Sequence, residues 1–171
     1  MSPPADIPPA MALGVEPREV GLMSRPPRDP KAGVLNRITW SVIGLQALLM
    51  AALTIAAYTI AIYVEHYPIQ DARSLAFACL TTIQLLHGLL SRTINRSVFE
   101  TGVLGNKWMI GAIIVSYGLM LMGIYCPGLN NWLQLTPVSG WSWIKIVVCA
   151  AIHAIFVELG KVLIRMFGGS I

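Results

Sequence analysis

The stretch from residue 38 to residue 64 contains no formal charge, and it limits what this chain can fold into more than any other feature. A bilayer core about 30 Å thick needs roughly 20 apolar residues in a helix, so this stretch predicts a transmembrane helix. Trp40 near its start and Tyr63 near its end suit the membrane–water interface. Three further apolar stretches follow, at 72–90, 108–126 and 143–166. The predicted fold class is therefore all-α, a transmembrane four-helix bundle.

Composition excludes most soluble classes of protein. Hydrophobic residues make up 56% of the chain and charged residues only 12%, whereas soluble domains carry about 25% charged residues. The basic residues are not clustered as a nucleic-acid-binding patch requires, so the expected partner is the lipid bilayer. The expected location is integral and multi-pass, in either an endomembrane or the plasma membrane. The first residues, MSPPADIPPA, lack a basic n-region and an early apolar run, so no cleavable signal peptide is expected.

The distribution of Lys and Arg predicts the orientation of the chain in the membrane. Ten of the twelve basic residues fall in 1–37, in 91–107 or at Lys161 and Arg165, and the other two are Arg73 and Lys145. Cytosolic loops carry the excess of basic residues, so both termini are expected in the cytosol. The expected organisation is a proline-rich cytosolic segment at 1–37, a transmembrane domain at 38–167 and a short tail at 168–171.

The second predicted span carries a polar stripe. Thr81, Gln84, His87 and Ser91 recur at steps of three and four, which places them on one helix face. The stripe could line a cation path, with Gln84 offering a carbonyl oxygen of the kind calcium prefers, or it could form hydrogen bonds between helices. In both cases we expect it to face protein, because an unpaired amide in hydrocarbon costs several kcal/mol. The apolar residues of the same span are expected to meet lipid, including Leu75, Leu85 and Leu89.

The fourth predicted span contains three further candidates. Glu158 precedes Lys161 by three residues, which favours an ion pair near the membrane surface. A hydrogen-bonded packing role is favoured for His153, because a metal site needs several converging ligands and none lies four residues after it. The sequence contains no glycine-rich phosphate loop, no H-E-x-x-H and no nucleophile elbow. We therefore expect no catalytic residues and no cofactor in this chain.

Three segments resemble P-type cation-transporting ATPases of the calcium and sodium pump type. DIPPAMALGVEPREVGLMSRPPRDPKAGVL (6–35) is similar to the segment that leaves the sixth membrane helix of these pumps. ARSLAFACLTTIQLLHGLLSRTINRSVFETGVLGNKWM (72–109) resembles the eighth helix, its loop and the start of the ninth, and FVELGKVLIR (156–165) resembles the end of the tenth. The resemblance spans about residues 5–167 and implies that the four predicted spans are the last four membrane helices of such a pump.

The resemblance also implies two cation-binding residues. Asp6 matches the carboxylate at the unwound part of the sixth helix, which is a cation ligand in calcium pumps. Gln84 matches an eighth-helix position that is a ligand carboxylate in some calcium pumps, and the amide found here lowers the charge of the site. His87 stands where asparagine is frequent. The implied transported ion is calcium or sodium, and no other metal ligands are expected.

The expected function is that of a membrane domain that supports ion transport but does not hydrolyse ATP alone. The 171 residues contain neither the D-K-T-G phosphorylation motif nor a stretch resembling the ATP-binding headpiece, so the isolated chain is not expected to be an enzyme. Its expected partners are the remaining portion of a pump or further copies of itself. Two alternatives remain open: a stand-alone membrane interaction or regulatory protein, and a small ion-conducting oligomer that uses the polar stripe.

Overall fold

The computed structural model describes residues 37–92 and 106–167, together with Met11 and Gly14. The described part of the chain forms five helices and no strand, namely α2 (Arg37–Tyr63), α3 (Ile69–Leu90), α5 (Lys107–Tyr125), α6 (Leu129–Leu133) and α7 (Gly140–Phe167). The four longer helices are long and apolar enough to cross a membrane. The prediction of an all-helical chain with four candidate spans is confirmed, and each predicted end lies within three residues of the observed one.

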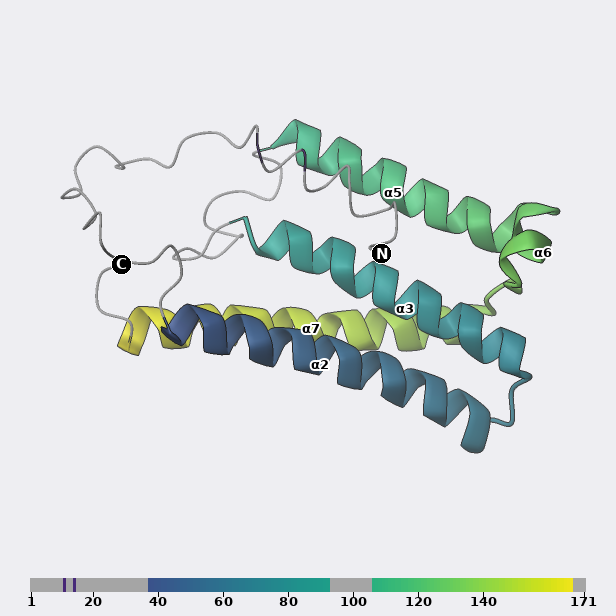
Figure 1. Ribbon diagram of the computed structural model, residues 1–171, viewed down its shortest axis with the longest axis horizontal. Coiled ribbons are helices and arrows are strands. Elements are labelled where there is room, and N and C mark those ends of the chain that lie inside the picture. The colour runs from purple at the N-terminus through teal and green to yellow at the C-terminus, as the bar shows by residue number, and fades with distance from the viewer. Residues whose placement is uncertain (1–10, 12–13, 15–36, 93–105, 168–171) are drawn as a thin grey trace.

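The four long helices alternate in direction. The start of α2, the end of α3, the start of α5 and the end of α7 lie at one end of the bundle (Figure 1). We call this the loop end, because α3 and α5 are joined there through residues 91–106. The turn between α2 and α3, together with α6, lies at the other end, which we call the turn end (Figure 1).

The turn between α2 and α3 satisfies the last carbonyls of α2. The N–H of Tyr67 donates to the carbonyl of Ala61 at 2.9 Å, and the N–H of Glu65 donates to that of Ile60 at 3.1 Å. His66 adopts a φ of 55° between them, as expected for a residue that ends a helix in the left-handed region. Pro68 then precedes α3, where its missing N–H leaves no helical hydrogen bond unmade. The chain therefore reverses within a few residues.

Helix α3 is the central element of the bundle. It packs against α7, α2 and α5, and 44% of its most apolar window is buried, compared with 11% for α2. Leu75 and Leu85 are only 1% and 4% exposed. The prediction that these two side chains meet lipid is therefore wrong. Neighbouring helices cover them, and an apolar side chain is accommodated equally well by lipid and by another apolar helix.

Small side chains bring the central helices close together. Ala57 and Ala61 of α2, Ala72 and Ala78 of α3, and Ala150 of α7 are all buried in one hydrophobic cluster. Alanine allows the helix backbones to approach more closely than larger residues would, which is how apolar helices gain packing contacts in a membrane. The core of the bundle is therefore a close contact of α2, α3 and α7.

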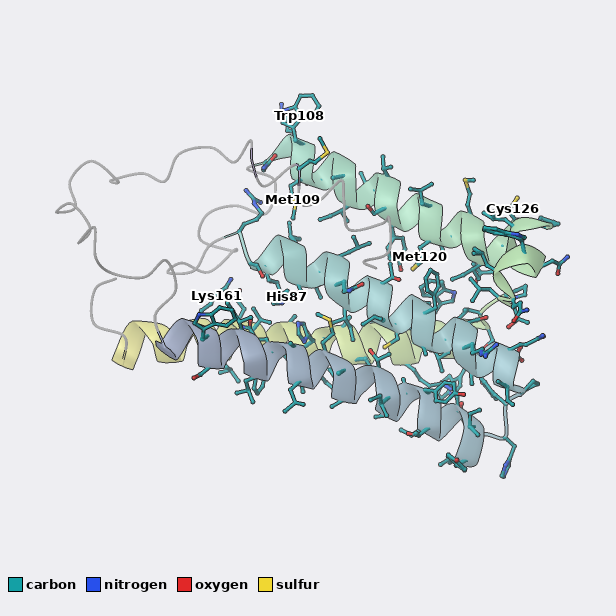
Figure 2. The ribbon with its side chains drawn as sticks, in the orientation of Figure 1. His87, Trp108, Met109, Met120, Cys126 and Lys161 are labelled. Atoms are coloured by element: carbon teal, nitrogen blue, oxygen red, sulfur yellow. The ribbon has the colours of Figure 1, made fainter. Side chains whose placement is uncertain are left out.

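The outer surface of the bundle is strongly apolar. Large hydrophobic side chains that are more than half exposed occur on α2, α5 and α7, and they include Leu48, Ile55, Trp108, Ile114, Val147 and Ile155. Trp108 projects away from the bundle (Figure 2). An apolar surface of this extent marks contact with a membrane or with other proteins, and its position on helices of spanning length supports an integral membrane location.

Helix α6 folds back against the end of α5. A Cβ on Gly123 of α5 would lie 3.3 Å from Cδ1 of Leu133, so glycine leaves the room that α6 needs. The short helix ends at Gln134, which has a φ of 55°. The connection at 127–142 carries no charged residue, and a helix of five residues is too short to leave a periodic apolar pattern in it.

Candidate functional site

A pair of histidines joins α3 to α7 within the bundle. Nδ1 of His87 and Nε2 of His153 lie 3.2 Å apart, and the two rings meet edge to face with centroids 5.2 Å apart. His153 is fully buried and His87 is half-buried. The hydrogen-bonded role predicted for His153 is confirmed. Its partner is a member of the polar stripe.

Ser91 extends the histidine pair to the exposed end of α3. Its hydroxyl donates to the backbone carbonyl of His87 at 2.7 Å, and its Oγ lies 3.2 Å from Nε2 of His87. A hydroxyl has one proton to donate, and Ser91 donates it to the carbonyl. In the contact between Oγ of Ser91 and Nε2 of His87, Nε2 must therefore be the donor. A neutral imidazole carries one N–H, and Nδ1 of His87 therefore accepts from the Nε2–H of His153. Both N–H groups point toward Ser91.

The same count of donors and acceptors leaves one nitrogen of His153 without a hydrogen bond among the described residues. If Nε2 of His153 carries the proton, Nδ1 of His153 carries a lone pair. This Nδ1 is buried and has no hydrogen-bond partner in the described part of the chain. Buried polar atoms nearly always have a partner, so Nδ1 of His153 is an acceptor that the described residues leave unused.

Charged and amide groups surround the loop end of the same interface. Lys161 donates to Oε1 of Glu158 at 2.7 Å, which confirms the ion pair predicted within the fourth span. Lys161 is only 5% exposed, and Figure 2 shows it with His87 between α3 and the other two central helices. Gln46 of α2 is also buried, and its Nε2 lies 3.6 Å from the position of a Cβ on Gly160 of α7. Polar groups from three helices therefore gather in this half of the bundle.

A second ion pair lies at the turn end. Lys145 of α7 pairs with Glu65 in the turn between α2 and α3. The same ammonium group lies 4.9 Å from the centroid of the Tyr67 ring, within the range of a cation–π contact. Both charged side chains are mostly buried, so this contact ties the turn to α7.

Hydroxyl groups fix the segment between α6 and α7. The N–H of Thr136 donates to Oγ of Ser74 at 2.7 Å. Tyr125 donates to the carbonyl of Val138 and accepts from Nε1 of Trp143, both at 2.8 Å. A small pocket at this end is lined by residues that include Asp71, Val138 and Ser142. These contacts hold the turn end together, and they lie on the part of α3 away from Gln84.

Comparison with known proteins places the chain in a family. A family model described as "Cation transporting ATPase, C-terminus" matches residues 5–163. The chain belongs to this family. It is 34% identical over 161 residues to the calcium-transporting ATPase of Bacillus subtilis, a match that covers 92% of the chain and 17% of that protein.

Other relatives of the chain are also named as calcium- or cation-transporting ATPases. The calcium-transporting ATPase type 2C member 2 of Rattus norvegicus is 30% identical over 161 residues, which covers 91% of the chain and 16% of that protein. The probable cation-transporting ATPase F of Mycobacterium tuberculosis is 27% identical over 164 residues, which covers 92% of the chain and 18% of that protein. The chain thus spans less than a fifth of the length of these relatives. It corresponds to the C-terminal membrane part of cation-transporting P-type ATPases.

The residues of the polar stripe on α3 differ in how deeply they are buried. Thr81 is 4% exposed, Gln84 and His87 are half-buried, and Ser91 is exposed. His87 contacts α7, and Gly88 faces α5, where a Cβ would lie 3.6 Å from Cε of Met109. Residues advance by about 100° along a helix, so Gln84 lies between the side facing α5 and the side facing α7. Asp6 lies outside the described residues.

The contact between His87 and His153 was not predicted from the sequence. The two residues are 66 positions apart, and each was interpreted within its own span. The sequence contained one indication of this contact. Both histidines are polar residues within apolar spans, and each needs a partner in hydrocarbon. Among the described residues, no group of three or more His, Cys, Asp or Glu side chains could hold a metal ion.

Proposed function

We propose that this chain is the C-terminal part of the membrane domain of a P-type cation pump and that it supports the transport of calcium. The family match over residues 5–163 carries the proposal. Relatives in Bacillus subtilis and Rattus norvegicus are named calcium-transporting ATPases, which favours calcium over sodium. In this proposal the transport site is completed by the remaining portion of the pump.

The arrangement around α3 is consistent with a supporting role. The helix packs against α2 and α7. One ion pair joins the turn before α3 to α7, and the other lies within α7. Gln84 is half-buried on a face between α5 and α7, where its amide oxygen could contribute to a site formed with another helix. Amide and carboxylate oxygens are the ligands that calcium prefers. We propose Asp6 and Gln84 as contributors to the cation site, on the basis of the resemblance.

Exchange of the matching segment in a working pump tests the proposed function. This chain should replace the matching segment of the calcium-transporting ATPase of Bacillus subtilis and leave ATP-dependent uptake of radioactive calcium by membrane vesicles measurable. A Gln84→Leu version should lose uptake, because leucine offers no oxygen to a cation. A Thr59→Val version is the control, since Thr59 bonds only backbone carbonyls of its own helix. An inserted chimera that still hydrolyses ATP but takes up no calcium would contradict the proposal.

The isolated chain should form no phosphoenzyme. Its 171 residues lack the D-K-T-G motif, so no aspartate is placed to accept the γ-phosphoryl group of ATP. Incubation of the purified chain with labelled ATP, followed by acid precipitation, should leave no label on the protein. Acid-stable label that hydroxylamine removes would show that the chain alone has phosphoryl-transfer activity.

We further propose that the loop end of the bundle faces the cytosol, with the proline-rich segment 1–37 and the tail 168–171 on the same side. The bias of basic residues supports this orientation. Cysteines introduced at Asn95 and Asn131, in a background without Cys79, Cys126 and Cys149, should react with an impermeant maleimide from opposite sides of sealed vesicles. Reaction of both positions from the same side would rule out the four-span arrangement.

A further inference from the structure

The interface between α3 and α7 contains a continuous row of hydrogen bonds with an unused acceptor at its buried end. The row runs from the exposed Ser91 through His87 to the fully buried His153. Nδ1 of His153 has no partner among the described residues. Rows of ionisable residues within a membrane commonly serve as proton pathways, and the lone pair at the buried end gives this row a point at which a proton can enter.

We propose that Ser91, His87 and His153 form a proton relay from the middle of the bundle to the loop end. The ligand of this site is a proton. The direction follows from the hydrogen-bond donors, because the N–H groups of both histidines point toward Ser91. A proton can therefore be taken up at Nδ1 of His153 and released at the exposed hydroxyl without prior rotation of either ring.

Each transfer in the relay conserves protons. A water molecule that inserts beside His153 delivers a proton to Nδ1, and the proton on Nε2 of that ring passes to Nδ1 of His87. The proton on Nε2 of His87 then passes to Oγ of Ser91. The original hydroxyl proton of Ser91, which the resting state donates to the backbone carbonyl of His87, turns to water and leaves. One proton enters and one leaves, and both imidazoles end neutral with the proton on Nδ1. Reorientation of the two rings and the hydroxyl restores the starting arrangement.

The surrounding charges favour passage of the proton over its retention. Among the described side chains of α7, Lys161 and Glu158 carry charge on the loop-end side of the pair, and Arg92 follows Ser91 just beyond the end of α3. Helix α2 offers the neutral Gln46, and α5 carries Lys107 only at its start. Cys79 of α3 and Cys149 of α7 lie next to each other and are also titratable. Lys161 and Arg92 oppose a lasting positive charge on the imidazoles, and Glu158 is the carboxylate near them in the part of the chain that the structure describes. We therefore infer that the pair passes a proton on and does not store it.

Nitrogen NMR on the full chain in lipid bilayers tests the arrangement. The chain has three histidines, so labelling with ¹⁵N-histidine gives few signals, and His66→Gln identifies the exposed one. His87 and His153 should each carry the proton on Nε2, with a ¹⁵N–¹⁵N coupling across their shared hydrogen bond. A proton on Nδ1 of His153 in the resting state, or the absence of that coupling, would overturn the relay.

Proton exchange with water tests the path. Ser91→Ala should slow the exchange of the imidazole N–H protons of His87 and His153 by at least about tenfold, because a positioned relay group accelerates proton transfer by that much or more. Ser91→Thr keeps the hydroxyl and should preserve the rate, and Thr59→Ala should change nothing. Equal exchange rates in the wild-type and Ser91→Ala chains would overturn the proposal. If Ser91→Ala fails to fold, the tautomers and coupling of the wild-type chain decide.

Discussion

Replacement of Glu158 by glutamine should lower the free energy of unfolding by about 3 kcal/mol or more. Lys161 is 5% exposed and donates to Glu158 at 2.7 Å. Removal of the carboxylate leaves a buried cation without the partner that offsets its loss of water, and breaking such a pair typically costs about 3–5 kcal/mol. Unfolding by sodium dodecyl sulfate in mixed micelles, followed by tryptophan fluorescence, measures the change.

The double variant Glu158→Gln, Lys161→Met is the matched control for this prediction. It removes both charges at nearly constant side-chain volume. No buried cation is then left without a partner, and that unpaired charge is the source of the cost in the single variant. We expect it to recover most of the stability lost in Glu158→Gln. If the single variant were as stable as the wild-type chain, Lys161 would have to reach water or headgroups in the folded protein.

Truncation of Leu75, which leaves a cavity, should have the second large effect on the free energy of unfolding. Leu75 of α3 is 1% exposed and belongs to the cluster shared by α2, α3 and α7. Leu75→Ala should cost about 2–5 kcal/mol, the range seen when a buried leucine is truncated and its surroundings cannot collapse. The same unfolding titration in mixed micelles measures the loss.

Leu48→Ala provides the comparison for this effect. Leu48 lies on α2 and is 66% exposed, so its truncation removes contacts with lipid and creates no cavity. We expect a change below about 1 kcal/mol for an exposed site. Equal losses at Leu48 and Leu75 would mean that α3 is not the central helix of the bundle.

The four long helices could be predicted because their signal is local. An uncharged run such as 38–64 indicates a membrane span from its own residues alone, and the bounds of α2 match that run closely. The ion pair of Glu158 and Lys161 was equally easy to predict, since its two members are one helical turn apart. The family could also be inferred from the sequence, through segments such as R-P-P-R at 25–28, and the comparison over residues 5–163 confirms it.

Contacts between helices could not be predicted in the same way. The partner of His87 depends on how α7 is rotated and shifted against α3. The hydropathy of one span determines neither the rotation nor the shift. The expectation for Leu85 failed for a related reason. Leucine is equally at home against lipid and against another apolar helix, so its hydropathy carries no information about which of the two it meets.

The central position of α3 has a consequence for how the chain is assembled in the membrane. Helix α3 is the least apolar of the four candidate spans and the most buried. Its neighbours come from both directions of the chain: α2 is made before it, and α7 is made last. No piece of the chain that ends before α7 contains the full set of contacts for α3, and His87 meets His153 only after the last helix has entered the bilayer. Synthesis of α7, and not insertion of α2, α3 and α5, is therefore the step that gives His87 its partner.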